Sequence, residues 1–339
     1  MIKERIKLLK LIKNLKINKA CLKENDEKKI GDYVVKERFG ADSAYGEVFN
    51  ACHISKGECE QNVAIKKIPL NKKEQKYILE KNVNESTVLT EIKILNLVNE
   101  LVLQNVSPNL PIVFKYFLCD DGVFRSDIKN IKNPSRYVFI VNEKATGDFI
   151  NFTTKIEPPL KYMINAYFQI FTGIYCLKKY LNIYHNDLHW GNVLYHKIDN
   201  KSKNRKYITY KLSNDLTVTI KNMGYLFTLW DFGLSYIPKK IIKNKPKNAY
   251  NWKTDYRRII SMLFLDSEQT NKDYHLLGVE MIYILSKSIN NIDFLYNIKT
   301  KFNLDENYQK TDYYYDLTKK LCTSDKSNSK FITPQNRSC

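Results

Sequence analysis

The sequence contains no apolar run that approaches the roughly 18 residues required for a membrane-spanning helix. Its first stretch does not resemble a secretory signal either, because lysines interrupt the apolar positions. The seven cysteines are scattered and include no CxxC pair, which favours reduced thiols over a disulfide framework or a zinc site. These absences predict a soluble protein that works inside a cell, in the cytoplasm or the nucleus.

Long unbroken blocks of lysine and arginine are also absent, although the net charge of the 339-residue chain is +19. A positive charge favours acidic partners such as nucleic acid, an anionic membrane or an acidic protein. A composition rich in Lys, Asn, Ile and Tyr explains the charge without such a partner, and the lack of blocks favours this second interpretation. Apolar residues make up 43% of the chain, which is enough to form a core.

One short stretch carries the clearest chemistry. Residues 184–192 read Tyr-His-Asn-Asp-Leu-His-Trp-Gly-Asn, so that Asp187 precedes Asn192 by five positions. A loop of this kind can direct a carboxylate at a substrate hydroxyl while the amide oxygen reaches a metal ion. Transfer of a phosphoryl group from Mg-ATP needs such a pair, because its catalysis is mostly positioning and charge neutralisation. The alternative is a simple turn rich in Asn and Asp.

Two further motifs flank this stretch in the chain. Upstream, Val63–Lys66 ends a strand-like run with a lysine, which in isolation would be a surface residue. Downstream, Trp230–Gly233 places Asp231 on a glycine-bearing turn after an apolar run. Each signal alone is weak, but the three in this order match the signature set of protein kinases.

The chain therefore resembles the protein-kinase superfamily, and within it the haspin-like kinases and the serine/threonine kinases of large DNA viruses. The closer resemblance rests on the form of residues 187–192, on residues 210–224, which resemble an extra hairpin, and on Thr254–Arg258, which resembles the start of the central C-lobe helix. It implies an α+β, bilobal protein-kinase-like fold, with a small antiparallel β-sheet N-lobe carrying one main helix and a reduced, mainly helical C-lobe. A viral source would place the protein in the host cell or the virion.

The resemblance also divides the chain. We expect a basic N-terminal extension at 1–30, a kinase N-lobe at 31–144, a kinase C-lobe at 145–323 and a polar tail at 324–339. The extension has apolar residues at near-helical spacing between lysines, which predicts a basic amphipathic helix. This helix would either dock on the domain behind it or bind an anionic membrane or a partner.

Catalytic roles follow from the same resemblance. Asp187 is expected to be the base that accepts the proton of the substrate hydroxyl, while Asn192 and Asp231 hold Mg²⁺. Lys66 would contact the ATP phosphates and be held by a helix carboxylate. Glu91 is preferred over Glu85 for that carboxylate, because the apolar residues around Glu91 have core-facing helical spacing.

Other positions of the loop support or depart from the family pattern. His185 and Asp255 are expected to brace the catalytic loop. His189 stands where most protein kinases have a lysine that neutralises the transferred phosphoryl group, and the same Asp-Leu-His-x-Gly-Asn form occurs in small-molecule kinases. Asn186 replaces the arginine that grips a phosphorylated activation loop, which predicts activity without phosphorylation of that loop.

The remaining nucleotide contacts are expected in the N-lobe and the linker. Backbone N–H groups of a glycine-bearing hairpin can approach phosphate oxygens, but the hairpin departs from GxGxxGxV: either Ala41 and Ser43 occupy two glycine positions or Gly40 serves through an insertion. Glu143 to Ala145 would bond adenine and Asp148 the ribose. The full predicted set is Gly40, Gly46, Val48, Ala64, Lys66, Glu143, Ala145 and Asp148.

The sequence thus predicts a monomeric serine/threonine protein kinase that uses ATP and Mg²⁺, with a protein substrate and, from the charge, an acidic or nucleoprotein partner. Two alternatives stay open. A small-molecule kinase similar to aminoglycoside phosphotransferases is favoured by His189, and a pseudokinase scaffold is favoured by the degraded glycine-rich loop.

Overall fold

The computed structural model describes residues 29–39, 46–82, 85–120, 136–202, 205–238, 251–265, 272–304 and 313–319. Residues 1–28, Gly40 with its neighbours up to 45, and the predicted polar tail lie outside the described residues. The described chain forms two compact units. Unit 1 is drawn from residues 1–99, 111–146 and 231–248, and unit 2 from residues 100–110, 147–230 and 249–339.

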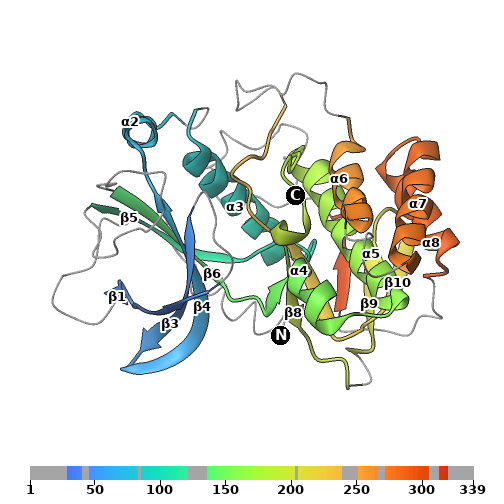
Figure 1. Cartoon of the computed structure of the whole chain (residues 1–339), viewed down its shortest axis with the longest axis horizontal. Helices are drawn as coiled ribbons and strands as arrows, with labels where there is room; N and C mark the ends of the chain where they lie inside the picture. Colours follow the sequence, from blue (N-terminus) through green and yellow to red (C-terminus); the bar gives the residue numbers. More distant parts are fainter. Residues whose placement is uncertain are drawn as a thin grey trace. The chain divides into compact units, whose positions relative to one another are not determined.

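Unit 1 is built on a six-stranded sheet in the order β1-β2-β3-β4-β6-β5, with each neighbouring pair antiparallel. Figure 1 shows these strands in blue to green, with α3 beside them. The elements are β1 (Lys29–Ile30), β2 (Tyr33–Arg38), β3 (Glu47–Ser55), β4 (Glu58–Pro69), α2 (Lys72–Leu79), α3 (Thr87–Leu103), β5 (Val113–Asp120) and β6 (Arg136–Glu143).

The β3–β4 hairpin is the longest pairing in this sheet. It closes at Lys56 and Gly57, which both have positive φ, the conformation that a type I′ hairpin turn requires. β6 is buried along almost its whole length, as its continuous Val, Phe and Ile pattern predicts. The sheet therefore fixes the positions of β3 and β4 from both sides.

Unit 2 is mainly helical and carries two small sheets, in the orders β11-β8-β7 and β10-β9-β12. Its helices are α4 (Phe149–Asn151), a π-helical segment (Phe152–Ile156), α5 (Leu160–Cys176), a second π-helical segment (Leu177–Leu181), a 3₁₀ turn (Trp190–Asn192), α6 (Thr254–Leu265), α7 (Lys272–Lys287) and α8 (Asn291–Lys301). Its strands are β7 (Gly147–Asp148), β8 (Val193–Lys197), β9 (Tyr207–Lys211), β10 (Thr217–Lys221), β11 (Tyr225–Leu229) and β12 (Tyr313–Asp316).

Aromatic side chains form much of the core of unit 2. Phe152 and Phe227 pack edge to face with ring centroids 4.9 Å apart, and Tyr256 packs on Phe294 at the same distance. α5 lies at the centre of the unit, and its residues from Ala166 to Cys176 are all buried. From α5 the chain continues through the second π-helical segment into the loop that carries Asp187.

The α+β architecture predicted from the sequence is confirmed, with a β-sheet unit and a mainly helical unit. A hairpin was expected at residues 210–224; the structure has one formed by β9 and β10, which pair antiparallel, and it begins earlier, at Tyr207. Strand β12, which pairs parallel with β9, was not predicted. Among the described helices, none combines the length and the apolar character that crossing a membrane demands.

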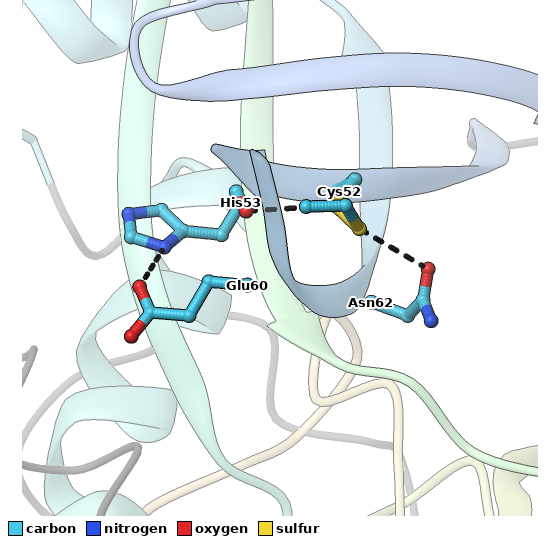
Figure 2. The surroundings of a disulfide bond; sticks show 5 residues. Cys52, His53, Glu60 and Asn62 are labelled. Carbon is cyan, nitrogen blue, oxygen red and sulfur yellow. Dashed lines mark hydrogen bonds and ion pairs between the residues drawn. A yellow bond between two sulfur atoms is a disulfide. The ribbon is translucent and has the colours of Figure 1, made fainter. Parts of the chain in front are cut away.

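The prediction of reduced thiols is wrong for one pair of cysteines. Cys52 on β3 and Cys59 on β4 form a disulfide, with their Cα atoms 5.7 Å apart (Figure 2). Sequence spacing alone missed it, because the hairpin folds the chain back and brings together two residues that are seven positions apart. Cys119 and Cys176 are buried free thiols, as expected.

Candidate active site

Lys66 lies on β4, between β3 and β6 in the sheet, and its side chain is buried. It pairs with Val48 across the β3–β4 register, and Ala64 lies two residues earlier on the same face. The predicted nucleotide contacts Val48, Ala64 and Lys66 are therefore brought together by the period-two alternation of two paired strands. Gly46 precedes β3, and a Cβ there would lie 2.6 Å from the backbone oxygen of Lys67, so that only glycine fits.

The ammonium of Lys66 contacts two carboxylates. Its Nζ lies 2.8 Å from Oε1 of Glu91 and 3.2 Å from Oδ1 of Asp231. Glu91 is buried on α3, whereas Glu85 lies in the turn before that helix. The structure thus brings Lys66, Glu91 and Asp231 together within unit 1, and it does not bring Glu85 to Lys66.

The buried position of these charges decides their protonation. Burial alone would lower the pKa of Lys66, but the carboxylates of Glu91 and Asp231 outweigh it and raise that pKa. Burial also raises the pKa of Glu91, and Lys66 opposes this effect. Lys66 is consequently a cation at neutral pH.

Asp231 has an unusual backbone conformation. Its φ is +59°, a left-handed value that few residues other than glycine adopt. The N–H of Gly233 donates to Oδ1 of Asp231 at 3.3 Å, which fixes the carboxylate against its own turn. Local strain of this kind is found where a side chain must be aimed.

Some polar groups of the predicted adenine linker are already hydrogen-bonded within the protein. The N–H of Glu143 donates to the carbonyl of Ile112, and Oε1 of Glu143 accepts from the N–H of the same residue, both at 3.0 Å. Ligand bonds from this linker would therefore come from groups other than the Glu143 N–H. Asp148, in unit 2, accepts from Asn151 with Oδ1 as the N-cap of α4. Ala145 is half-buried at the end of unit 1.

In unit 2, Asp187 and Asn192 face each other across a short loop. The side-chain amide of Asn192 donates to the backbone oxygen of Asp187 at 2.8 Å and to its Oδ2 at 3.2 Å. The N–H of Trp230 donates to the carbonyl of Asn192 at 2.8 Å. Asn192 therefore presents its side-chain oxygen with its nitrogen already engaged, and the residue after Trp230 in the chain is Asp231.

The buried carboxylate of Asp255 binds the backbone just before Asp187. The two oxygens of Asp255 accept from the backbone N–H groups of His185 at 2.8 Å and Asn186 at 3.0 Å. His185 is fully buried, and its Nε2 lies 2.7 Å from the carbonyl of Trp230. Asn186 takes a left-handed φ of +64°, so the backbone turns sharply immediately before Asp187. The predicted bracing residues are thus placed around Asp187.

His189 is engaged locally. Its Nδ1 accepts from the N–H of Gly191 at 3.1 Å and caps the 3₁₀ turn. A Cβ on Gly191 would lie 2.9 Å from the His189 ring, so this glycine makes room for the imidazole. Sequence reasoning missed Trp190, whose indole N–H donates to Tyr167 on α5 at 2.9 Å and anchors the turn in the core. A tryptophan inside a polar loop was the available signal.

Asn192 of unit 2 and Asp231 of unit 1 each carry a side chain whose chemistry suits Mg²⁺. Asn192 and Asp231 offer amide and carboxylate oxygens, the ligands that this hard cation prefers. Within the part of the chain that the structure describes, no group of three or more His, Cys, Asp or Glu side chains could hold a metal. Mg²⁺ typically binds through one or two protein groups together with waters and substrate phosphates.

Comparison with known proteins bears on this geometry. The model of the family described as protein tyrosine and serine/threonine kinase matches residues 34–236, which is more than half of the chain. No curated protein matches the sequence. The matched segment contains Lys66, Glu91, Asp187, Asn192 and Asp231. The chain belongs to the protein tyrosine and serine/threonine kinase family.

Proposed function

We propose that this protein transfers the γ-phosphoryl group of ATP to serine or threonine hydroxyls of a protein substrate. One observation carries the proposal: Lys66 is ion-paired to both Glu91 and Asp231. Phosphoryl transfer in protein kinases needs this lysine–glutamate pair and a metal-binding aspartate together. A scaffold that no longer bound nucleotide would have no need to keep three charged groups in contact.

Asp187 is the base in this proposal. Its carboxylate accepts the proton of the substrate hydroxyl as the hydroxyl oxygen bonds to phosphorus. Asn192 and Asp231 would each offer an oxygen ligand to Mg²⁺, which would supply positive charge to neutralise the phosphate oxygens. Lys66 contacts the phosphates, Val48 and Ala64 line the nucleotide face of the sheet, and Gly46 allows close approach of the backbone.

The finer assignments are proposals as well. The kinase N-lobe spans 31–144 and the C-lobe 145–323, and the affinity to haspin-like and viral kinases is supported by the β9–β10 hairpin between the catalytic loop and Asp231. Activity without loop phosphorylation is supported by Asn186, which carries no charge to grip a phosphate. A sample treated with phosphatase should keep its activity, and a large loss would contradict this point.

A small-molecule kinase is the second candidate, and His189 favours it. In place of a flexible lysine, the loop presents an imidazole fixed to Gly191. The two candidates differ in the acceptor that is phosphorylated, not in the way ATP is held.

The test is transfer of radiolabel from ATP with Mg²⁺ to a protein mixture, with wild type compared to Asp187→Asn. The variant should lose about 10²–10⁴-fold in rate, the usual contribution of general-base catalysis. Asp215→Asn, an exposed aspartate between β9 and β10, is the matched control and should retain full activity. Phosphoamino-acid analysis should find phosphoserine or phosphothreonine.

Other outcomes would redirect the assignment. Label on tyrosine alone contradicts the Ser/Thr specificity. ATP hydrolysis or transfer to a small acceptor without labelled protein supports the second candidate. Failure of Mg-ATP to raise the melting temperature contradicts both candidates, because any ligand that binds only the folded state stabilises it.

A further inference from the structure

The distal end of the β3–β4 hairpin carries two cysteines of very different exposure. Cys52 is buried, with 1% of its surface exposed, whereas Cys59 is exposed to solvent. The disulfide joins them across a β-bulge between His53 and Ile54, where the register shifts by one residue. A bulge bends a strand locally, and the Cα separation of 5.7 Å falls within the range that disulfides adopt.

A second contact holds the same end of the hairpin without any sulfur. Nδ1 of His53 lies 3.4 Å from Oε2 of Glu60, as Figure 2 shows, and the ring of His53 packs on Tyr33 with centroids 5.2 Å apart. The backbone pairing continues on both sides of the bulge, from Glu47 to Ser55. The two strands should therefore stay paired when the disulfide is opened, so that oxidation and reduction can occur in the folded protein.

We propose that Cys52 and Cys59 form a reversible thiol–disulfide exchange site that small-molecule disulfides of the glutathione class oxidise and their thiols reduce. Cys59 is the entry point, because it is the exposed residue of the pair. The two states differ in the rigidity of the hairpin that carries Val48 and Lys66.

Each step is a thiolate displacement. The thiolate of Cys59 attacks one sulfur of the disulfide RSSR, forms a Cys59–SR bond and releases RS⁻. The thiolate of Cys52 then attacks the sulfur of Cys59, forms the Cys52–Cys59 bond and releases a second RS⁻. The two protons lost by the cysteines leave with the two RS⁻ groups, so that two protein thiols and one RSSR give one protein disulfide and two RSH.

The other described cysteines should not take part. Cys119 and Cys176 are buried, and burial raises the pKa of the Cys176 thiol to about 12, which suppresses the reactive thiolate. They therefore serve as internal controls in the same molecule.

The first test equilibrates the full-length native protein in buffers of varied reduced to oxidised glutathione ratio, followed by alkylation and peptide mapping. The Cys52–Cys59 pair should pass from dithiol to disulfide within this range, while Cys119 and Cys176 stay reduced. The proposal is overturned if the pair is reduced only after unfolding, or if it remains a dithiol in oxidised glutathione alone.

Two variants test the order of attack. Cys52→Ser should accumulate a mixed disulfide with glutathione on Cys59, whereas Cys59→Ser should leave Cys52 largely unmodified. Equal modification of the two variants contradicts an entry at Cys59.

The last test compares the rigidity of the oxidised and reduced states of the wild-type hairpin, with two cysteine variants as controls. Amide hydrogen exchange of residues 52–62 should be slower in the oxidised protein, and its melting temperature should be higher by several degrees. Cys119→Ala should show the same difference between its two states, and Cys52→Ser should show none. Identical amide hydrogen exchange rates in oxidised and reduced wild type would contradict the proposal that the disulfide makes the hairpin more rigid.

Discussion

The two units hold their candidate catalytic groups by different means. In unit 1, three charged side chains from separate segments compensate one another, with Lys66 in contact with both Glu91 and Asp231. In unit 2, the catalytic loop is fixed by hydrogen bonds to backbone groups, and among the described residues Asp187 has no ion-pair partner.

The difference agrees with what each group must do. A cation that binds phosphate must stay charged in a buried place, and neighbouring carboxylates ensure this for Lys66. A general base must accept a proton, and an adjacent cation would make its carboxylate a weaker acceptor. Loss of one charge should therefore damage unit 1 most, while loss of a hydrogen-bond acceptor should damage unit 2.

The largest effect is expected from Lys66→Met. The change leaves Glu91 buried beside Asp231 without a cation, and breaking a buried pair in this way costs about 3–5 kcal/mol of the free energy of unfolding. Urea denaturation of purified protein measures it. Activity should fall below detection, because the proposed phosphate contact is lost as well.

The double variant Lys66→Met/Glu91→Leu is the matched control. It removes both charges, so its free energy of unfolding should recover most of the loss while activity stays absent. If the double variant is as unstable as the sum of its single variants, the carboxylate of Glu91 is not compensated by Lys66 and the comparison of the units fails.

Asp255→Asn should produce the next largest effect. An amide side chain offers one acceptor where the carboxylate offers two, so either His185 or Asn186 loses its partner. A buried N–H without an acceptor costs about 1–3 kcal/mol. Because the loop that carries Asp187 shifts, kcat should fall while the KM for ATP changes little.

Steady-state kinetics separates these quantities, and Asp215→Asn again provides the surface control. An equal rise in KM for ATP and loss of kcat would mean that Asp255 supports the nucleotide site and not the catalytic loop.

The sequence predicted those residues of the candidate site that lie in short, contiguous motifs. Asp187 and Asn192 lie in one loop, and the motifs that contain Lys66 and Asp231 are each four residues long. Glu91 was preferred over Glu85 because helical spacing is also a local pattern, and Glu91 is the residue in contact with Lys66.

Features that depend on register or distant pairing were not predicted. The Cys52–Cys59 bond depends on a bulge, which no alternation of residue types indicates. β12 pairs with β9, a strand far away in the sequence, and such pairing leaves no mark in a local window. The burial of Lys67, which by strand alternation lies on the opposite face of β4 from Lys66, is also not indicated by any local pattern.

Lys67 allows a smaller test of charge compensation in unit 1. Its Nζ lies 3.4 Å from Oε2 of Glu47 and 4.5 Å from the ring centroid of Tyr137. Glu47→Gln should lower the free energy of unfolding by about 1–2 kcal/mol, less than Lys66→Met because the Tyr137 ring still faces the cation. Thermal and urea melts measure the change.

The exposed carboxylate of Glu60, on the same hairpin, is the control for this substitution. Glu60→Gln breaks the pair with His53 at the surface, where ion pairs contribute at most about 1 kcal/mol. If the two substitutions lower the free energy of unfolding equally, burial of the Glu47–Lys67 pair does not increase its contribution to stability.

The smallest expected effect concerns a lysine in unit 2 that lacks full compensation. Burial lowers the pKa of Lys178 from 10.5 to about 8, and Asp255 only partly opposes this. The unfolded chain then binds more protons than the folded protein between pH 8 and 10.5, so this group makes stability rise with pH in that window. Below pH 8 the Lys178 ammonium is charged in both states, so the full cost of burying that charge lowers the stability of the folded protein.

Lys178→Met should remove this pH dependence. The free energy of unfolding of wild type should rise relative to the variant by about 1 kcal/mol from pH 8 to 10.5, a figure reduced for solvent screening of a partly exposed group. Taking the difference between the two proteins cancels the other groups that titrate there. A flat difference would show that Lys178 is compensated after all, since its ammonium already donates to Asn182 and lies over the ring of Tyr184. Unit 2 would then hold its cations as effectively as unit 1 holds Lys66, and the contrast between the units would be confined to Asp187.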